Sequence, residues 1–179
     1  MMTERYLVMP RGINVGTRNR VPMAELRSML TDVGYADVAT VLQSGNVIVA
    51  AESSGPDEVA ASVQRLLSDR FNVDVPCVTR TAGQVRAVLD RNPLQEVVTD
   101  NSRYLVNFLS EKPDSEAADA LLAEGHGPEA IAIEGTEAFV WTPDGVKAMT
   151  LSYAFLEKRL GVVATARNWN TLQKIAAKL

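Results

Sequence analysis

The first eighty residues alternate short continuous apolar runs with longer segments in which apolar residues recur every three or four positions. Short continuous runs are typical of buried strands, whereas the helical spacing indicates amphipathic helices. The elements predicted in this way are, in chain order, a strand at 6–9, a helix at 22–33, hairpin strands at 38–42 and 47–49, a helix at 56–70 and a strand at 73–78. This βαββαβ order is that of the ferredoxin-like fold.

The second half mixes the same two patterns. Thr81 and Gln84 have the spacing of a capping box, which predicts a helix from Thr81 to Asn92. The later elements predicted are a strand at 102–109, a helix at 114–124, hairpin strands at 130–133 and 138–141, and helices at 152–160 and 168–179. We therefore predict an α+β protein. Its ferredoxin-like half, residues 1–80, packs on a second α+β layer with C-terminal helices, residues 81–179, in a pattern consistent with a distant duplication.

The composition is that of an ordinary globular protein, with 46% hydrophobic and 22% charged residues among 179. No apolar stretch approaches the roughly 18 residues that a membrane-spanning helix needs, and the N-terminal residues hold no signal-peptide core. Cys77 is the only cysteine, which excludes an intramolecular disulfide and is typical of a reducing compartment. We therefore expect a cytoplasmic protein with no membrane partner.

Histidine chemistry and metal binding are disfavoured by residue counts. His126 is the only histidine, and its neighbours in Glu124–Pro128 predict a solvated turn. One histidine and one cysteine cannot form a zinc site of the usual kind, and no motif supports a serine or cysteine nucleophile paired with His126. We expect no metal, and the residues identify no catalytic group, cofactor or oligomeric state.

The charge is unevenly distributed along the chain. The net charge is −4, yet residues 1–27 carry +3 and residues 153–179 carry +4, which leaves −11 for the residues between them. Positive ends on an acidic protein favour a local anion site over a nucleic-acid surface, which usually makes a whole domain basic. The alternative is that solvated arginines and lysines simply cluster near the termini.

The segment Arg11-Gly12-Ile13-Asn14-Val15-Gly16 follows the first strand and precedes a helix. Backbone amides and an arginine at such a junction are suited to holding an anion. The segment lacks the lysine of a nucleotide-hydrolysing P-loop and the spacing of a dinucleotide-binding loop. The alternative is a tight connection in which Asn14 bonds its own turn.

Two further polar segments carry candidate chemistry. Gln43-Ser44-Gly45-Asn46 contains a hydroxyl and two amides, but a hairpin turn explains its glycine and asparagine without a function. We interpret Ser44 as a hydrogen-bond donor rather than a nucleophile, because no base or strand-to-helix elbow accompanies it. Near the C-terminus, Arg167 begins the segment Arg-Asn-Trp-Asn-Thr at a helix start, where the helix dipole disfavours a cation.

That placement of Arg167 is best explained if an anion or a carboxylate shares the site. An internal salt bridge is the main competitor. A purely structural interpretation makes Asn168 the helix cap and Trp169 a core residue.

The three segments Arg11–Gly16, 43–47 and 166–171 occur in this order in an uncharacterised bacterial family, the domain of unknown function 1697, which the chain resembles over almost its whole length. The resemblance implies an α+β fold with a ferredoxin-like N-terminal portion. It implies no activity, substrate or catalytic residue. Gly16 is followed here by Thr17, whereas the family often has a second glycine, which weakens an argument from extreme loop flexibility.

The leading functional hypothesis is binding, with or without turnover, of a small anionic metabolite that bears a phosphate or nucleotide. The proposed binding residues are Arg11, Asn14, Ser44, Asn46, Arg167, Asn168, Trp169 and Asn170. Arginines would hold the charge, amides and Ser44 would orient it, and Trp169 would stack. The alternatives are binding of single-stranded nucleic acid, which the low aromatic content disfavours, and a scaffold or interaction protein whose motifs are structural.

Overall fold

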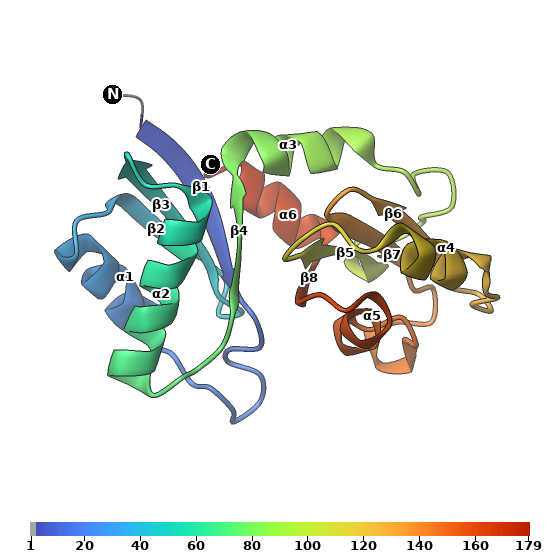
Figure 1. Cartoon of the computed structure of the whole chain (residues 1–179), viewed down its shortest axis with the longest axis horizontal. Coiled ribbons are helices and arrows are strands. Elements are labelled where there is room, and N and C mark those ends of the chain that lie inside the picture. The colour runs from blue at the N-terminus through green and yellow to red at the C-terminus, as the bar shows by residue number, and fades with distance from the viewer. Residues whose placement is uncertain (1–2) are drawn as a thin grey trace. The chain divides into compact units, whose positions relative to one another are not determined.

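The computed structural model describes residues 3–179, which divide into two compact units. The first unit comprises Met1–Ala87, described from residue 3 onward, together with Lys174–Leu179, and the second unit comprises Val88–Gln173. The division falls inside two helices, α3 (Ala82–Arg91) and α6 (Trp169–Ala176) (Figure 1). Each unit has its own four-stranded sheet.

The first unit is a four-stranded antiparallel sheet with two helices on one face. Its elements are β1 (Thr3–Pro10), α1 (Met23–Asp32), β2 (Ala36–Val41), β3 (Asn46–Glu52), α2 (Pro56–Phe71) and β4 (Cys77–Thr81). The strands lie in the order β2-β3-β1-β4, and each neighbouring pair is antiparallel. This arrangement confirms the ferredoxin-like prediction for the N-terminal half.

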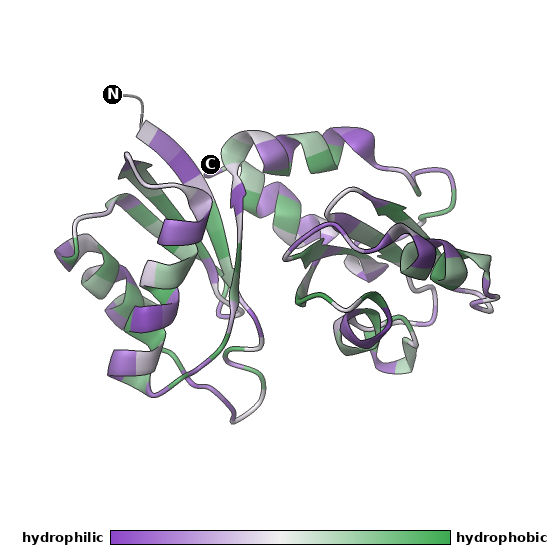
Figure 2. Cartoon of the chain, viewed as in Figure 1, coloured by the Kyte–Doolittle hydropathy of each residue, from purple (hydrophilic) through white to green (hydrophobic). Residues whose placement is uncertain are grey.

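The core of the first unit lies between the sheet and the two helices. Strand side chains alternate between the two faces of a sheet, so one residue in two contacts the helices. The residues that form this core include Tyr6, Val8, Val47 and Val49 from the strands and Leu26, Leu30, Val59 and Val63 from the helices. Figure 2 shows α2 alternating between hydrophobic and hydrophilic residues along its length, as a helix half covered by a sheet requires.

The second unit repeats the topology of the first. Its elements are β5 (Tyr104–Leu109), α4 (Ser115–Ala123), β6 (Ala130–Glu134), β7 (Glu137–Trp141), α5 (Tyr153–Leu160) and β8 (Ala164–Asn168), with short 3-10 helices at Asn101–Arg103 and Val146–Ala148. The strand order β6-β7-β5-β8 matches β2-β3-β1-β4 strand for strand. The predicted second α+β layer is therefore itself a ferredoxin-like βαββαβ unit, and its core contains Leu109, Leu121, Val140 and Leu156.

The shared topology makes individual positions equivalent. Each fourth strand, β4 or β8, leads directly into a helix, α3 or α6. The second-to-last residue of that strand is an arginine in both units, Arg80 in the first and Arg167 in the second. Arg80 pairs with Leu7 of β1 and Arg167 with Val106 of β5, at matching places in the two ladders.

Two predictions differ from the structure in the type of element. The strand predicted at 73–78 begins only at Cys77, because Pro76 has no N–H to give to a ladder and residues 73–76 form an irregular connection. Arg167 does not begin a helix. It lies in β8, a strand that the sequence pattern missed, and α6 begins at Trp169 and ends at Ala176.

Candidate functional site

The connection between β1 and α1 folds back on itself around Asn14. The Asn14 side chain donates to the carbonyl of Val21 at 3.0 Å and accepts from the N–H of Val21 at 2.7 Å. Its main-chain N–H donates to the carbonyl of Asn19, whose own amide donates to Gly12. Asn14 and Asn19 both have positive φ, a conformation that asparagine tolerates better than most residues. The predicted turn is therefore a fixed structure, held largely by asparagine side chains.

The β2–β3 hairpin loop lies against this connection. Asn14 also donates to the carbonyl of Gln43, at 2.7 Å. A Cβ added to Gly45 would lie 2.4 Å from the Cδ1 atom of Ile13, so only glycine fits there without displacing Ile13. Two of the three segments that carry the family resemblance are thus in direct contact within the first unit.

Asn46 and Ser44 form a second hydrogen-bonded pair inside the hairpin loop. Asn46 is fully buried at the start of β3, and its amide donates to the carbonyl of Val41 at 2.9 Å and to the hydroxyl oxygen of Ser44 at 3.2 Å. Ser44 is exposed. Since the Ser44 oxygen accepts from Asn46, its O–H proton remains able to donate to a ligand.

Arginines dominate the charge of this part of the first unit. Arg11 is half-buried, and its main-chain N–H donates to the carbonyl of Pro76 at 2.9 Å. Arg18 and Arg20 are exposed, and their guanidinium groups make no hydrogen bond or ion pair with any residue of 3–179. No acidic residue occurs between Arg5 and Glu25. The sequence prediction counts Arg18 and Arg20 in the positive charge of residues 1–27 but does not name them as binding residues, although this unbroken positive stretch marks them.

The Arg167 segment of the second unit is largely engaged in internal contacts. The buried Arg167 guanidinium donates to the hydroxyl of Thr165 at 2.7 Å and to the carbonyl of Ala166 at 2.8 Å. Burial lowers the pKa of Arg167 to about 10, which still leaves it cationic at neutral pH. Asn168 accepts from the N–H of Thr171 at 2.9 Å and so caps α6.

Trp169 and Asn170, the remaining predicted binding residues of this segment, differ in exposure to solvent. Trp169 is buried and stacks on Tyr104, with ring centroids 4.8 Å apart, whereas Asn170 is exposed on the first turn of α6. The tryptophan ring is therefore a packing element of the second unit, and because it is buried, stacking on a ligand would require it to be uncovered first.

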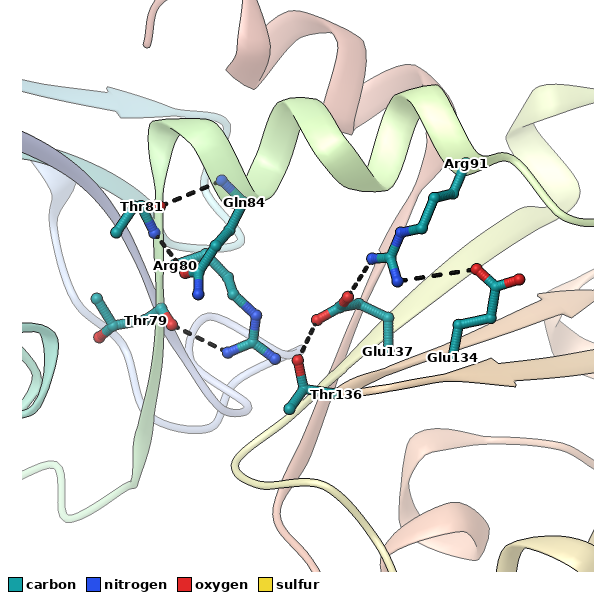
Figure 3. A network of polar contacts seen from close by, with 8 residues as sticks. All are labelled: Thr79, Arg80, Thr81, Gln84, Arg91, Glu134, Thr136 and Glu137. Carbon is teal, nitrogen blue, oxygen red and sulfur yellow. Dashed lines mark hydrogen bonds and ion pairs between the residues drawn. The ribbon is translucent and has the colours of Figure 1, made fainter.

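Arg80 in the first unit makes the same kind of main-chain contact as Arg167 in the second. Arg80 is buried and donates to the carbonyl of the preceding residue, Thr79, as Arg167 does to Ala166. Thr81 and Gln84 then exchange hydrogen bonds at the start of α3, which confirms the predicted capping box (Figure 3). The signal that could have found Arg80 is the matched order of arginine, capping residue and helix in both halves.

Figure 3 also shows a cluster of charged residues that belongs to the second unit. Arg91, at the end of α3, forms a hydrogen-bonded ion pair with Glu137, lies 3.7 Å from a carboxylate oxygen of Glu134 and sits over the ring of Phe139. Glu137 is buried and also accepts from the hydroxyl of Thr136 at 2.5 Å. Its carboxylate is therefore satisfied within this cluster.

Neither a metal site nor a membrane span emerges from the described chain. Within residues 3–179, no group of three or more histidine, cysteine, aspartate and glutamate side chains is arranged to hold a metal ion. No helix in that range is long and apolar enough to cross a bilayer.

Comparisons with known proteins agree on family and fold. A family model described as "Protein of unknown function (DUF1697)" matches residues 2–139. A solved structure, that of the conserved bacterial protein SP0830 from Streptococcus pneumoniae, superposes with a TM-score of 0.75 at 22% identity and covers 99% of each chain. At that identity the likeness shows a shared fold. No curated protein matches the chain.

Proposed function

The chain belongs to the DUF1697 family, whose description assigns no function, and we propose from the geometry of its first unit that it binds a small phosphate-bearing anion. The observation that carries the proposal is the pair of uncommitted, exposed guanidinium groups of Arg18 and Arg20. They stand on a connection whose backbone is already fixed by Asn14 and Asn19. A fixed loop loses little conformational entropy when it binds a ligand.

Arginine suits such a ligand because its planar guanidinium donates two parallel hydrogen bonds to phosphate oxygens. The O–H of Ser44, on the neighbouring loop, supplies a further donor. Asn14 and Asn46 would act as the frame of the site rather than as ligand contacts, because their amides bond to Val21, Gln43 and Val41.

The contribution of the other predicted residues to this function remains a prediction. Arg11 begins the loop and would add positive charge beside Arg18 and Arg20. That Arg167 and Asn170 of the second unit bind an anion is a separate prediction, as is the cytoplasmic, reducing location expected from the single cysteine.

The two alternative hypotheses have different support. Ferredoxin-like RNA-binding domains stack bases on aromatic residues of the open sheet face. The corresponding face of the first unit instead carries the buried aliphatic side chains of Leu7, Met9, Ile48 and Val78, so no observation favours that function. A scaffold protein would account for the internal bonds of Asn14, Asn46 and Asn168, but it gives no role to Arg18 and Arg20.

The proposal is tested by titrating inorganic phosphate, ribose 5-phosphate and AMP into the full chain, with binding followed by amide NMR shifts. We expect at least one probe to shift the signals of Gly12, Gly16 and Ser44. The double variant Arg18→Ala/Arg20→Ala should weaken binding by roughly tenfold, the value of one lost charge-assisted hydrogen bond.

The matched control removes two other exposed arginines of the same unit, Arg65 and Arg70 of α2. The Arg65→Ala/Arg70→Ala protein loses the same net charge and should bind as the wild type does. Equal weakening in both double variants would reveal general attraction between charges and contradict the proposal. Absence of shifts at the two loops with every probe would contradict it as well.

A further inference from the structure

The two units have a hollow at the same place in their shared topology. In the first unit it lies between the α1–β2 and β3–α2 connections, contacts Tyr35, Glu52 and Ser62, and has a volume of about 180 Å³. In the second unit it lies between the α4–β6 and β7–α5 connections and has a volume of about 530 Å³. Only the second falls within the range of about 300–1,000 Å³ typical of small-molecule sites.

The cavity of the second unit is larger because the connections around it are longer. The α1–β2 and β3–α2 connections span only residues 33–35 and 53–55, whereas the equivalent connections of the second unit span 124–129 and 142–152. Connections that lengthen in one copy of a fold are where binding residues commonly reside. The added residues bring His126, Glu129 and Asp144 to the wall of the cavity.

Three side-chain donors of the cavity wall, those of Arg159, Thr142 and His126, are already engaged within the protein. Both terminal nitrogens of Arg159 donate to the carboxylate of Glu124, and this pairing holds the pKa of Glu124 below its usual value. The hydroxyl of Thr142 donates to the carbonyl of Gly145 at 3.1 Å. The Nε2 atom of His126 lies 2.8 Å from the carbonyl of Leu121 and must carry the proton there, because a carbonyl only accepts.

The acceptors of the wall remain available. The carboxylate of Asp144 is exposed and has no hydrogen bond or ion pair with any residue of 3–179. With its proton on Nε2, a neutral His126 ring keeps Nδ1 as an acceptor. Glu129 accepts from the main-chain N–H groups of Thr150 and Leu151 and keeps its negative charge beside the cavity.

The charge of the cavity wall also favours a ligand that carries positive charge. Glu124 and Arg159 neutralise each other, so Glu129 and Asp144 leave the cavity negative. Phe155 and Ala148 add carbon surface. A ligand that fits must supply donors and positive charge and carry a short apolar portion. We propose that this cavity of the second unit is a ligand site that binds a small organic cation with a primary ammonium group.

The test is an amide NMR titration of the full chain with putrescine, a small diamine, at physiological salt to suppress diffuse attraction between charges. We expect shifts confined to the cavity loops, at Gly125, Gly127, Gly145 and Thr150. Asp144→Asn should weaken binding about three- to fivefold, the value of one solvent-exposed ion pair. Ala148→Phe, at an exposed position on the wall, should fill the cavity and abolish the shifts without changing the charge.

Glu116→Gln is the matched control, since Glu116 is an exposed carboxylate on the first turn of α4 and does not line the cavity. It should leave putrescine binding unchanged. The inference is overturned if putrescine causes no shifts at about 10 mM, a concentration that detects even very weak binding. It is also overturned if Asp144→Asn and Ala148→Phe behave like Glu116→Gln, or if inorganic phosphate shifts the same amides while putrescine does not.

Discussion

The side chain of Ile13 occupies the space that a Cβ on Gly45 would need. The built Cβ lies 2.4 Å from Cδ1 and 2.8 Å from Cγ1 of Ile13, and Ile13 is itself almost fully buried. Gly45 also has a φ of +85°, which residues with a side chain rarely adopt. Two independent constraints, backbone conformation and packing, therefore require glycine where the two loops of the first unit meet.

Gly45→Ala should destabilise the protein by about 2–3 kcal/mol, of which about 1 kcal/mol comes from the positive φ and the rest from crowding against Ile13. Gly135 is the matched control. It holds the equivalent hairpin turn in the second unit, has a φ of +59°, and has no atom within 4 Å of a built Cβ. Gly135→Ala should therefore cost only the conformational part. Urea unfolding of both variants measures the difference, and equal costs would contradict the packing argument.

The hairpin of the first unit was predictable, but its contact with Ile13 was not. Ser44-Gly45-Asn46 between two apolar runs predicts a turn from local patterns alone. Ile13 lies far from Gly45 in sequence, and nothing in the periodicity of either segment indicates that the two loops touch. Local rules thus find where glycine stands, whereas the packing reason for it depends on the tertiary fold.

Strand β8 shows that a hydrophobic pattern can also fail to predict an element that exists. Its residues Ala-Thr-Ala-Arg-Asn contain no large apolar side chain, so neither a buried nor a half-buried strand was expected. The strand exists because it pairs with β5, from Leu105 to Leu109. Arg167 was consequently assigned to a helix start, and the argument from the helix dipole was applied to a residue that lies in a sheet.

The sequence predicted some residues of the candidate site but not their roles. The polar residues Asn14 and Asn46 were found from their type and position, yet their internal hydrogen bonds appear only when the chain folds. Arg18 and Arg20 contribute to the positive charge of residues 1–27 in the sequence, but only the structure shows that no described residue partners their guanidinium groups. The distinction between frame and contact residues therefore comes from the folded structure.

The N-terminal caps of α3 and α6, the helices that follow β4 and β8, should contribute similar amounts to the free energy of unfolding. Asn168→Ala removes the bond to the Thr171 N–H and should cost about 1 kcal/mol, as should Thr81→Ala, which removes the bond to the Gln84 N–H. Asn168→Asp retains an acceptor oxygen and should be close to wild type. These values can be measured by urea unfolding. A large loss in Asn168→Asp would show that the amide N–H₂ of Asn168, rather than its capping oxygen, carries the stability.

The Arg91–Glu137 ion pair should couple strongly because the Glu137 side chain is only 7% exposed. A double-mutant cycle with Arg91→Met and Glu137→Gln should give a coupling of about 1–3 kcal/mol that persists in 0.5 M salt, since buried pairs are weakly screened. The exposed Arg159–Glu124 pair of the same unit is the control. Its coupling should be smaller and should fall with salt. Two pairs of equal strength and equal salt dependence would contradict the role assigned to burial.

Cys77 should be an unreactive thiol in the folded protein. Burial raises its pKa to about 12, so the thiolate that reacts with alkylating reagents is scarce at pH 8. Although a more basic thiolate attacks faster, the net rate of iodoacetamide reaction should be about 10- to 100-fold below that of a free small thiol. The raised pKa also means that folding stability falls as pH rises from about 9, where an unfolded thiol ionises, toward 12. Alkylation in urea supplies the control and should proceed at the rate of a free thiol. Equal rates in the folded and unfolded protein at pH 8 would show that Cys77 is accessible and its pKa ordinary.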